Sequence, residues 1–347
     1  MPALREGPLT EYVPAPTLRW LLLADPARIA AVPGALEALA PLVNDAGWSR
    51  FTERNGFDPR RSPRLLVAGF ELGTLSLIEP PDLPGPAHGR SMEERFRQRL
   101  LHGEVVTRPH PALTRVQGVV AGSPQALLRV EDRFVAHADG DPSLIRVVEG
   151  FLLGRFTKTP SALRGATLRA HATFGDNAPL RAWFPGPLDD PSVFPDSELF
   201  HTATAGLVAL ELFDPSSCPP RGTCPPQGQP RQHEGPALRL QLALAGPWSS
   251  DGDASSLERL WRSLAQSALG RLLRLDAPLS PPRSQVVPTA DGTRIELVLE
   301  LALAPLVRGL HDVVAGELPD LLAARPPEGP APVSPVPAFR RSEEAVD

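Results

Sequence analysis

Acidic side chains and one histidine gather in a proline-rich stretch in the second half of the chain. They are Asp189, Asp190, Asp196, Glu198 and His201. Carboxylates beside a histidine can bind a divalent cation or act as a general acid and base. Short segments broken by proline are also commonly solvated acidic loops. We adopt this simpler interpretation, and predict no metal ligands and no cofactor.

A second candidate site lies on the polar face of a predicted strand over residues 168–174. Arg169 and His171 alternate there with apolar residues, and Arg181 follows on what we expect to be a neighbouring strand. Arginine forks fit carboxylate and phosphate groups, so these three side chains are our candidate ligand-binding residues for a small anion. Polar faces of antiparallel sheets carry such residues without a ligand as well, and this alternative stays open.

Sequence motifs exclude several classes of enzyme. The chain contains no Gly-x-Ser-x-Gly elbow, His-Glu-x-x-His, Gly-x-Gly-x-x-Gly, P-loop or Cys-x-x-Cys. Lys158 is the single lysine and no glycine-rich loop precedes it, which argues against Schiff-base and kinase-type chemistry. The formal net charge of −5 opposes attraction to phosphate backbones, so we expect no nucleic-acid partner.

Two Asp-Gly-Asp segments begin like calcium-binding loops. Residues 139–141 and 251–253 both lack the later glycine and acidic residue that such loops need. The first precedes Pro142 and the second lies near Ser255, so we predict that both segments cap helices. The arginines of a further predicted helix, Arg95, Arg97 and Arg99, are expected to keep that helix solvated.

The two cysteines lie close together in a proline-rich loop. Cys218 and Cys224 flank the segment Pro-Pro-Arg-Gly-Thr, whose glycine and prolines permit a tight turn. We predict a disulfide between them, which would persist in an oxidising compartment. Two free thiols are the alternative. A metal site is not expected, because only His233 follows nearby.

Periodicity and capping residues predict a first half that mixes strands and helices. Strands are predicted over residues 19–24, 64–70, 74–78, 114–121 and 132–137. Helices are predicted after Asp25-Pro26, over 33–43, from Asn44 to Gly56, from a capping box at Ser91 to Leu101, and after Asp141-Pro142.

Strict alternation of apolar and polar residues marks the strands of the second half. These strands run over residues 168–174, 238–244 and 295–301, each with one apolar and one solvated face. A helix over 254–275, opened by a capping box of Ser255 and Glu258, should cover the apolar face. The predicted fold class is α+β, with antiparallel sheets, helices packed on one face and two related halves.

The predicted organisation has four parts. They are an extended N-terminal segment 1–17, an α+β half 18–160, an α+β half 161–322 with a Pro-rich loop at 214–236, and a disordered tail 323–347. Leu144-Ile145-Arg146 and Leu306-Val307-Arg308 each precede a glycine by the same interval, which suggests an internal repeat. The apolar periodicity of two amphipathic helices explains this match equally well.

Neither a membrane span nor a signal peptide is predicted. No apolar run approaches the roughly 20 residues that a helix needs to cross a bilayer. Residues 1–8 contain no charged region followed by an apolar stretch, so either the protein is cytosolic or a leader was removed. A removed leader would leave room for a lipid anchor.

The chain resembles bacterial exported proteins of unknown function, which are often lipoproteins. The resemblance rests on a style rich in Leu, Ala, Pro and Arg, on the segment 178–186 (Ala-Pro-Leu-Arg-Ala-Trp-Phe-Pro-Gly), and on two α+β halves with a loop cysteine pair. It covers architecture more than motifs and carries over no functional residues. It implies a location in the periplasm or outer envelope.

These observations favour a binding function. We expect a non-catalytic, envelope-associated protein that binds a partner or small ligand through its sheet face or long loops. One alternative is a hydrolase-like enzyme whose site forms only in three dimensions around His171, His201 and nearby acids. The other is a cytosolic interaction protein.

Overall fold

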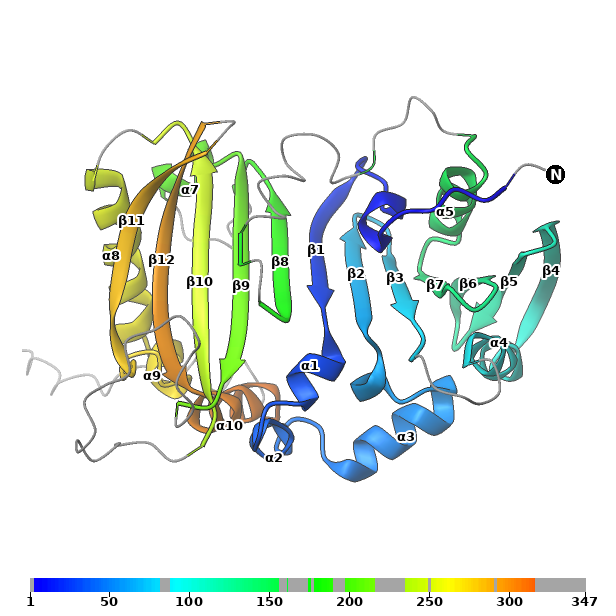
Figure 1. Ribbon diagram of the computed structural model, residues 1–347, viewed down its shortest axis with the longest axis horizontal. Helices are drawn as coiled ribbons and strands as arrows, with labels where there is room; N and C mark the ends of the chain where they lie inside the picture. The colour runs from blue at the N-terminus through cyan, green and yellow to red at the C-terminus, as the bar shows by residue number, and fades with distance from the viewer. Residues whose placement is uncertain are drawn as a thin grey trace, which may run out of the picture.

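One antiparallel sheet organises the part of the protein that the structure describes (Figure 1). The structure is a computed structural model that describes residues 3–81, 88–155, 161, 174–175, 178–189, 197–215, 235–248, 251–289 and 292–315. Within these ranges twelve strands form a single sheet, and helices pack against it. The predicted α+β class is confirmed.

The first half of the chain supplies the first seven strands. They are β1 (Leu18–Ala24), β2 (Arg64–Phe70), β3 (Thr74–Glu79), β4 (His102–His110), β5 (Leu113–Val120), β6 (Ser123–Val130) and β7 (Phe134–Asp139). The helical elements of this half are η1 (Leu9–Tyr12), α1 (Pro26–Ala30), α2 (Ala35–Leu39), α3 (Asp45–Asn55), η2 (Pro59–Arg61), α4 (His88–Gln98) and α5 (Ser143–Leu152).

The second half supplies the other strands and a long covering helix. Its strands are β8 (Leu180–Pro185), β9 (Ala205–Phe213), β10 (Ala237–Gly246), β11 (Ser280–Thr289) and β12 (Gly292–Ala302). Its described helices are α7 (Glu198–Thr202), α8 (Asp251–Gln266), α9 (Ala268–Leu272) and α10 (Leu303–Ala315).

The two halves meet at the centre of the sheet, where β1 pairs with β8. Leu21 lies opposite Trp183 at this junction. Counted outward from this junction, the strand order is β1-β2-β3-β7-β6 in the first half and β8-β9-β10-β12-β11 in the second. In both halves three consecutive strands are followed by two later strands in reverse order. The strands β5 and β4 then extend the first half. The described halves therefore form one continuous sheet with β4 and β11 at its edges.

Successive residues of each strand point to opposite faces of this sheet. We call one the α5 face, because α5 and η1 cover it in the first half; Ile145 and Phe151 of α5 share its core with Leu66 and Ala136. We call the other the α4 face. There Phe96 of α4 packs against the side chains that alternate with those of the α5 face, such as Val135, which precedes Ala136 on β7.

The α4 face is covered at both ends of the sheet. In the first half, the buried side chains Met92 and Phe96 of α4 form a cluster with Leu127 and Val135. In the second half, α8 lies over β11 and β12 and buries Trp261. Described helices thus pack on one face of β11 and β12 but on both faces of β6 and β7.

Capping residues located several helix ends correctly. The Asn44 side chain accepts a hydrogen bond from Gly47 N at 2.8 Å, and Gly56 ends α3 with a φ of 81°. A left-handed residue at a helix end is strained for any side chain but fits glycine. Before α5 the Asp141 carboxylate accepts from Ser143 N at 2.9 Å, but Pro142, one residue later than predicted, is the N-cap residue.

Both predicted capping boxes are wrong. The α4 helix begins at His88, one turn before Ser91, so Ser91 lies inside the helix. Likewise α8 begins at Asp251, so Ser255 lies inside the helix. In each case a serine three residues before a glutamate matched the box, although an earlier residue began the helix.

The strand prediction missed β4, β6, β9 and β11, and the long predicted helix over 254–275 is divided. No residue of β4 is buried and most are exposed, so its sequence has no apolar alternation to detect. Two consecutive helices replace the single one, because the Ser267 side chain accepts a hydrogen bond from Gly270 N and caps α9.

Replacement of the α3 cap should have a small and specific effect. We expect Asn44→Ala to lower the free energy of unfolding by about 1 kcal/mol, because Gly47 N loses its acceptor. Asn44→Asp should retain most of the stability. Urea unfolding of the three proteins measures the difference, and equal stability of Asn44→Ala and the parent would show that this cap contributes nothing.

Candidate functional site

A cavity of about 500 Å³ opens on the α4 face between α3 and the sheet. Its floor comes from β6 and β7, its wall from α3, and one further side chain from the residue after the end of α4. The lining residues are Gln125, His137 and Asp139 on the strands, Arg50, Phe51, Arg54 and Asn55 on α3, and Arg99. We call it the arginine cavity.

Local helix geometry explains how α3 lines this cavity. Arg50 and Arg54 are four residues apart, so they lie on the same side of the helix. The end of α3 is pressed against α4: a Cβ on Gly56 would lie 2.9 Å from the backbone of Ser91. This close approach fixes α3 beside α4. It therefore also places Arg50 and Arg54 in the same cavity as Arg99.

Arg99 is the most unusual cation of the cavity. Its Nε atom is buried and has no hydrogen-bond partner among the described residues. Its guanidinium lies 5.9 Å from the ring centroid of Phe96. Burial, and then the charge of Arg54, lower the pKa of Arg99, although an arginine remains protonated at physiological pH. The site therefore holds a charge whose hydrogen-bonding capacity is not satisfied.

His137 on the cavity floor is held as a neutral imidazole. Burial, followed by the nearby charge of Arg99, lowers its pKa to about 4, against a smaller opposing effect of Asp139. Its Nε2 lies 3.1 Å from Oε1 of Gln125, a contact that favours the tautomer with the proton on Nε2. The ring also contacts Phe96 edge to face at 5.7 Å.

The cavity has an excess of positive charge. Its three arginines form no ion pair within the described residues, and its one carboxylate, Asp139, already accepts a hydrogen bond from Ser123 Oγ at 2.7 Å. Charged guanidinium groups bind carboxylates and phosphates through paired, charge-assisted hydrogen bonds. The arrangement is therefore suited chemically to hold an anion. When an anion is bound, the neutral His137 could take up a proton.

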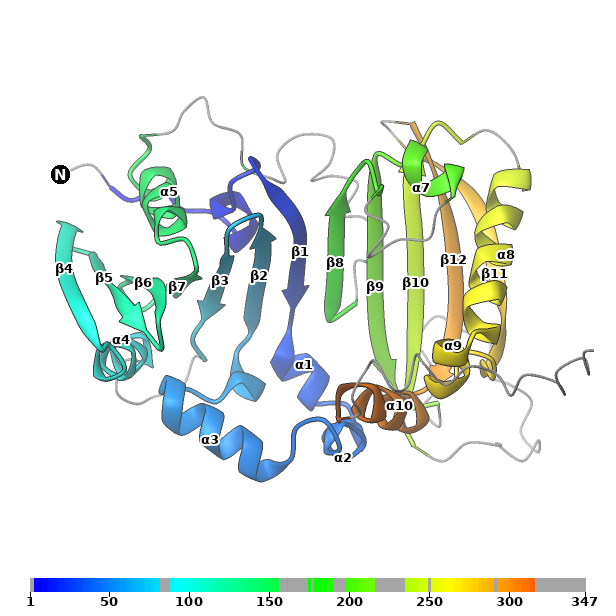
Figure 2. The ribbon, with the colours of Figure 1, turned by 180° about the vertical axis from the view of Figure 1, so that it is seen from behind.

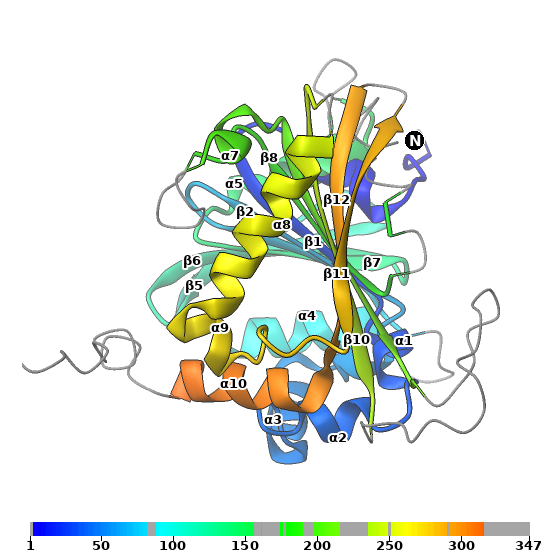
Figure 3. The ribbon, with the colours of Figure 1, turned by 90° about the vertical axis from the view of Figure 1, so that its left-hand side faces the viewer.

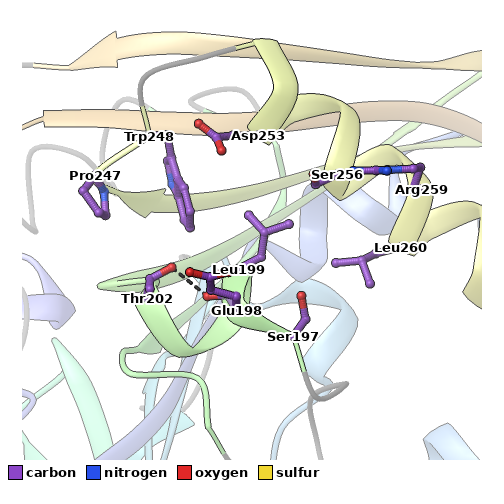
Figure 4. A pocket seen from close by; sticks show the side chains of 10 residues that line it. All are labelled: Ser197, Glu198, Leu199, Thr202, Pro247, Trp248, Asp253, Ser256, Arg259 and Leu260. Carbon is purple, nitrogen blue, oxygen red and sulfur yellow. Dashed lines mark hydrogen bonds between the residues drawn. The ribbon is translucent and has the colours of Figure 1, made fainter.

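A larger but less suitable cavity lies between α7 and α8 (Figure 4). It measures about 620 Å³ and contains one arginine, Arg259, with Glu198 and Asp253. Arg259 donates to Ser256 Oγ at 2.8 Å, and Thr202 Oγ1 donates to the backbone oxygen of Glu198 at 2.7 Å. Because these groups already have partners, this second cavity offers no unmet hydrogen-bonding capacity comparable to Arg99.

The predicted ligand-binding residues do not form the arginine cavity. Arg169 and His171 lie outside the described residues. Arg181 lies on β8, half-buried, with Leu23 of β1 and Ala209 of β9 as its neighbours in register. Its side chain is therefore on the α5 face, opposite to the cavity. The cysteine pair, Cys218 and Cys224, also lies outside the described residues, so the disulfide stays a prediction.

The acidic stretch is described only in part. Asp189 is exposed, and Glu198 and His201 belong to α7. Asp190 and Asp196 lie outside the described residues. Within the described ranges no three His, Cys, Asp or Glu side chains are grouped so that they could hold a metal ion. None of the helices that the structure describes is long and apolar enough to cross a membrane.

The polar face of the second half carries ion pairs, and part of it is covered. Arg239 of β10 contacts the carboxylates of Glu211 and Glu300 on the flanking strands, each at 3.0 Å. Arg294 is only 11% exposed and lies 5.2 Å from the ring centroid of Phe174. The prediction of a fully solvated face is therefore wrong, since Phe174 covers part of it.

Sequence patterns did not single out the arginine cavity. Arg99 follows a helix that carries three other arginines, and only packing shows that it differs from them: Arg97, for example, is exposed and pairs with Glu104. The expectation that Arg95, Arg97 and Arg99 are all solvated is wrong for Arg99. No family model, no curated protein and no solved structure matches this chain, so the site is interpreted from its own geometry.

Proposed function

We propose that this protein is a non-catalytic binder that takes a small organic anion into the arginine cavity. The observation that carries the proposal is the convergence of Arg50, Arg54 and Arg99 without ion pairs among the described residues. Like charges held together in one cavity repel each other, and Arg54 lowers the pKa of Arg99 for this reason. A bound anion would remove that repulsion.

The unsatisfied Nε of Arg99 supports the same proposal. A buried donor without a partner costs roughly 1–3 kcal/mol, more when it is charged. A carboxylate or phosphate oxygen in the cavity would accept from the guanidinium nitrogens of Arg99 that face it. Binding would therefore compensate a charge that is partly buried and lies near the charge of Arg54.

The size and walls of the cavity set limits on the ligand. A volume of about 500 Å³ falls in the range of small-molecule sites and exceeds the needs of a bare inorganic ion. Phe51 lines one wall and is 39% exposed, which offers an apolar surface beside the cations. These features favour an organic anion with a carboxylate or phosphate head and an apolar part.

Calorimetric titration with matched probes tests this function. We expect saturable binding of hexanoate or phenylphosphate, weaker binding of inorganic phosphate, and no binding of hexyltrimethylammonium. Arg99→Met should weaken the anion by roughly 10- to 100-fold, the effect of losing a charge-assisted hydrogen-bonding group. Arg262→Met, on the exposed side of α8, is the matched control and should change nothing. Absence of saturable binding by every anion would refute the proposal.

The cell envelope remains the proposed location, on the strength of the predicted Cys218–Cys224 disulfide and the resemblance to exported proteins. Intact-mass measurement of natively isolated protein, with and without a thiol-alkylating reagent, tests it. Two alkylated thiols without reduction would favour the cytosolic alternative. The hydrolase-like alternative around His171 and His201 has no described geometry that favours it.

A further inference from the structure

A band of half-buried apolar side chains crosses the centre of the α4 face. Its members are Trp20, Leu22, Val67, Ala182, Val208 and Leu210. None of them belongs to a core cluster of the described residues. Their neighbours on the α5 face, such as Leu21, Leu66 and Leu207, are buried. The exposed part of the band therefore lies on the α4 side of the sheet.

The described helices stop short of this band on both sides. Figure 2 shows β1, β8 and β9 between α8 at one side of the sheet and α3 and α4 at the other. In Figure 3, which looks along the sheet, α8 and α4 project from the same face. Among the described residues, the band therefore lies on the part of the α4 face between α8 and the helices α3 and α4.

Strand register joins this band to the arginine cavity. Leu22 lies opposite Ala182 on one side and Val67 on the other, and Ala182 lies opposite Val208. Val67 lies opposite Ser76, whose partner on β7 is His137. Because neighbouring strands are about 4.8 Å apart, the row from His137 to Val208 is about 24 Å long.

Trp20 extends the apolar surface toward the cavity. A Cβ on Gly69 would lie 2.2 Å from Cε2 of the Trp20 ring, so the indole rests directly on the backbone of that glycine. Gly69 pairs with Thr74, and Thr74 pairs with Asp139 in the cavity. The indole therefore lies over β2, and the row Gly69–Thr74–Asp139 leads from there across β3 to the cavity on β7.

We infer that the ligand is an amphiphile, with its anionic head in the arginine cavity and a long alkyl chain laid across the apolar band. This inference rests on the proposed function and names the ligand class of the same site. The cations complement the head, and the apolar row begins where the charged cavity ends. Each methylene removed from water strengthens binding by up to about fourfold, so a long chain should bind far more tightly than a short one.

A chain-length series tests this inference separately from the proposed function. We expect hexadecanoate and hexadecyl phosphate to bind at least tenfold more tightly than hexanoate, each measured below its critical micelle concentration. The two head groups distinguish a carboxylate from a phosphate ligand. Equal affinity for short and long chains would overturn the amphiphile but leave the anion site standing. Failure of every anion to bind would remove both.

Isosteric variants of the band provide the second test. The double variant Leu22→Asn and Val67→Thr should weaken hexadecanoate several-fold and leave hexanoate unchanged, because only the long chain reaches both side chains. Arg99→Met should weaken both ligands. Val105→Thr, on the exposed edge strand β4, is the matched control and should affect neither. A double variant that binds hexadecanoate as the parent does would contradict the inferred path.

Trp20 offers a direct reporter of the chain position. A brominated long-chain fatty acid should quench part of the tryptophan fluorescence, and Trp20→Phe should abolish most of that quenching without abolishing binding. Quenching that persists in Trp20→Phe would place the chain elsewhere and overturn the inference.

Discussion

Glu149→Ala should destabilise the protein by about 3–5 kcal/mol, the usual loss when one partner of a buried ion pair is removed. Glu149 lies on α5 with its side chain 7% exposed, and its Oε2 is 2.7 Å from Nη1 of Arg115 on β5. The Nε of Arg115 is already buried without a partner in the described residues. The variant would therefore leave a nearly buried guanidinium with little compensation, and urea unfolding should show the loss.

Two further variants separate burial of charge from loss of packing. The double variant Arg115→Met and Glu149→Leu should recover much of the stability, because no charge remains unpaired. Glu211→Ala removes a partner of the more exposed Arg239, which keeps Glu300, and should cost less than about 1 kcal/mol. A loss for Glu149→Ala as small as that for Glu211→Ala would show that the α5 contact is not a buried pair in solution.

Acidification should destabilise the protein through His137. Its pKa is lowered to about 4 in the folded state, against 6.5 for an unperturbed histidine. Between these values the unfolded chain binds a proton that the folded protein refuses, so stability falls as the pH falls. The contribution is fully present above about pH 6.5 and is lost by about pH 4, a change of roughly 3 kcal/mol.

The variant His137→Gln isolates this contribution from that of the carboxylates. Both proteins should lose stability in acid, but the variant should lose roughly 2–3 kcal/mol less between about pH 7 and pH 4.5. Urea unfolding at the two pH values measures the difference. Parallel pH profiles for the two proteins would contradict the burial of a neutral imidazole. A bound anion should raise the pKa of His137, so ligand affinity should increase in the same pH range.

Local patterns predicted the fold where one element decides the outcome. Alternating residues defined both β10 and β12; β12 buries one face, whereas β10 has buried residues on both faces although its leucines alternate in the sequence. Asn44 and Gly56 defined both ends of α3, since capping depends on a few adjacent residues. The edge strand β4 was missed because its side chains are exposed on both faces and leave no period to detect.

The candidate site was missed because long-range packing creates it. Arg54, Arg99 and His137 come from three separate elements, and none of them stands out within its own segment. What distinguishes Arg99 is the absence of a partner for a buried nitrogen, a property of the assembled structure alone. The site predicted from the sequence for a small anion, at Arg169, His171 and Arg181, differs from the site proposed here, since Arg181 lies on the opposite face of the sheet.

The most direct test of the anion site observes the side-chain Nε–Hε group of Arg99 by heteronuclear NMR. Titration with hexanoate should shift this signal in a saturable manner, because the bound anion pairs with the same guanidinium. The Nε–Hε signal of Arg239, already bonded to Glu300, should stay in place. A stationary Arg99 signal at saturating anion, or equal shifts of Arg99 and Arg239, would contradict the proposed site.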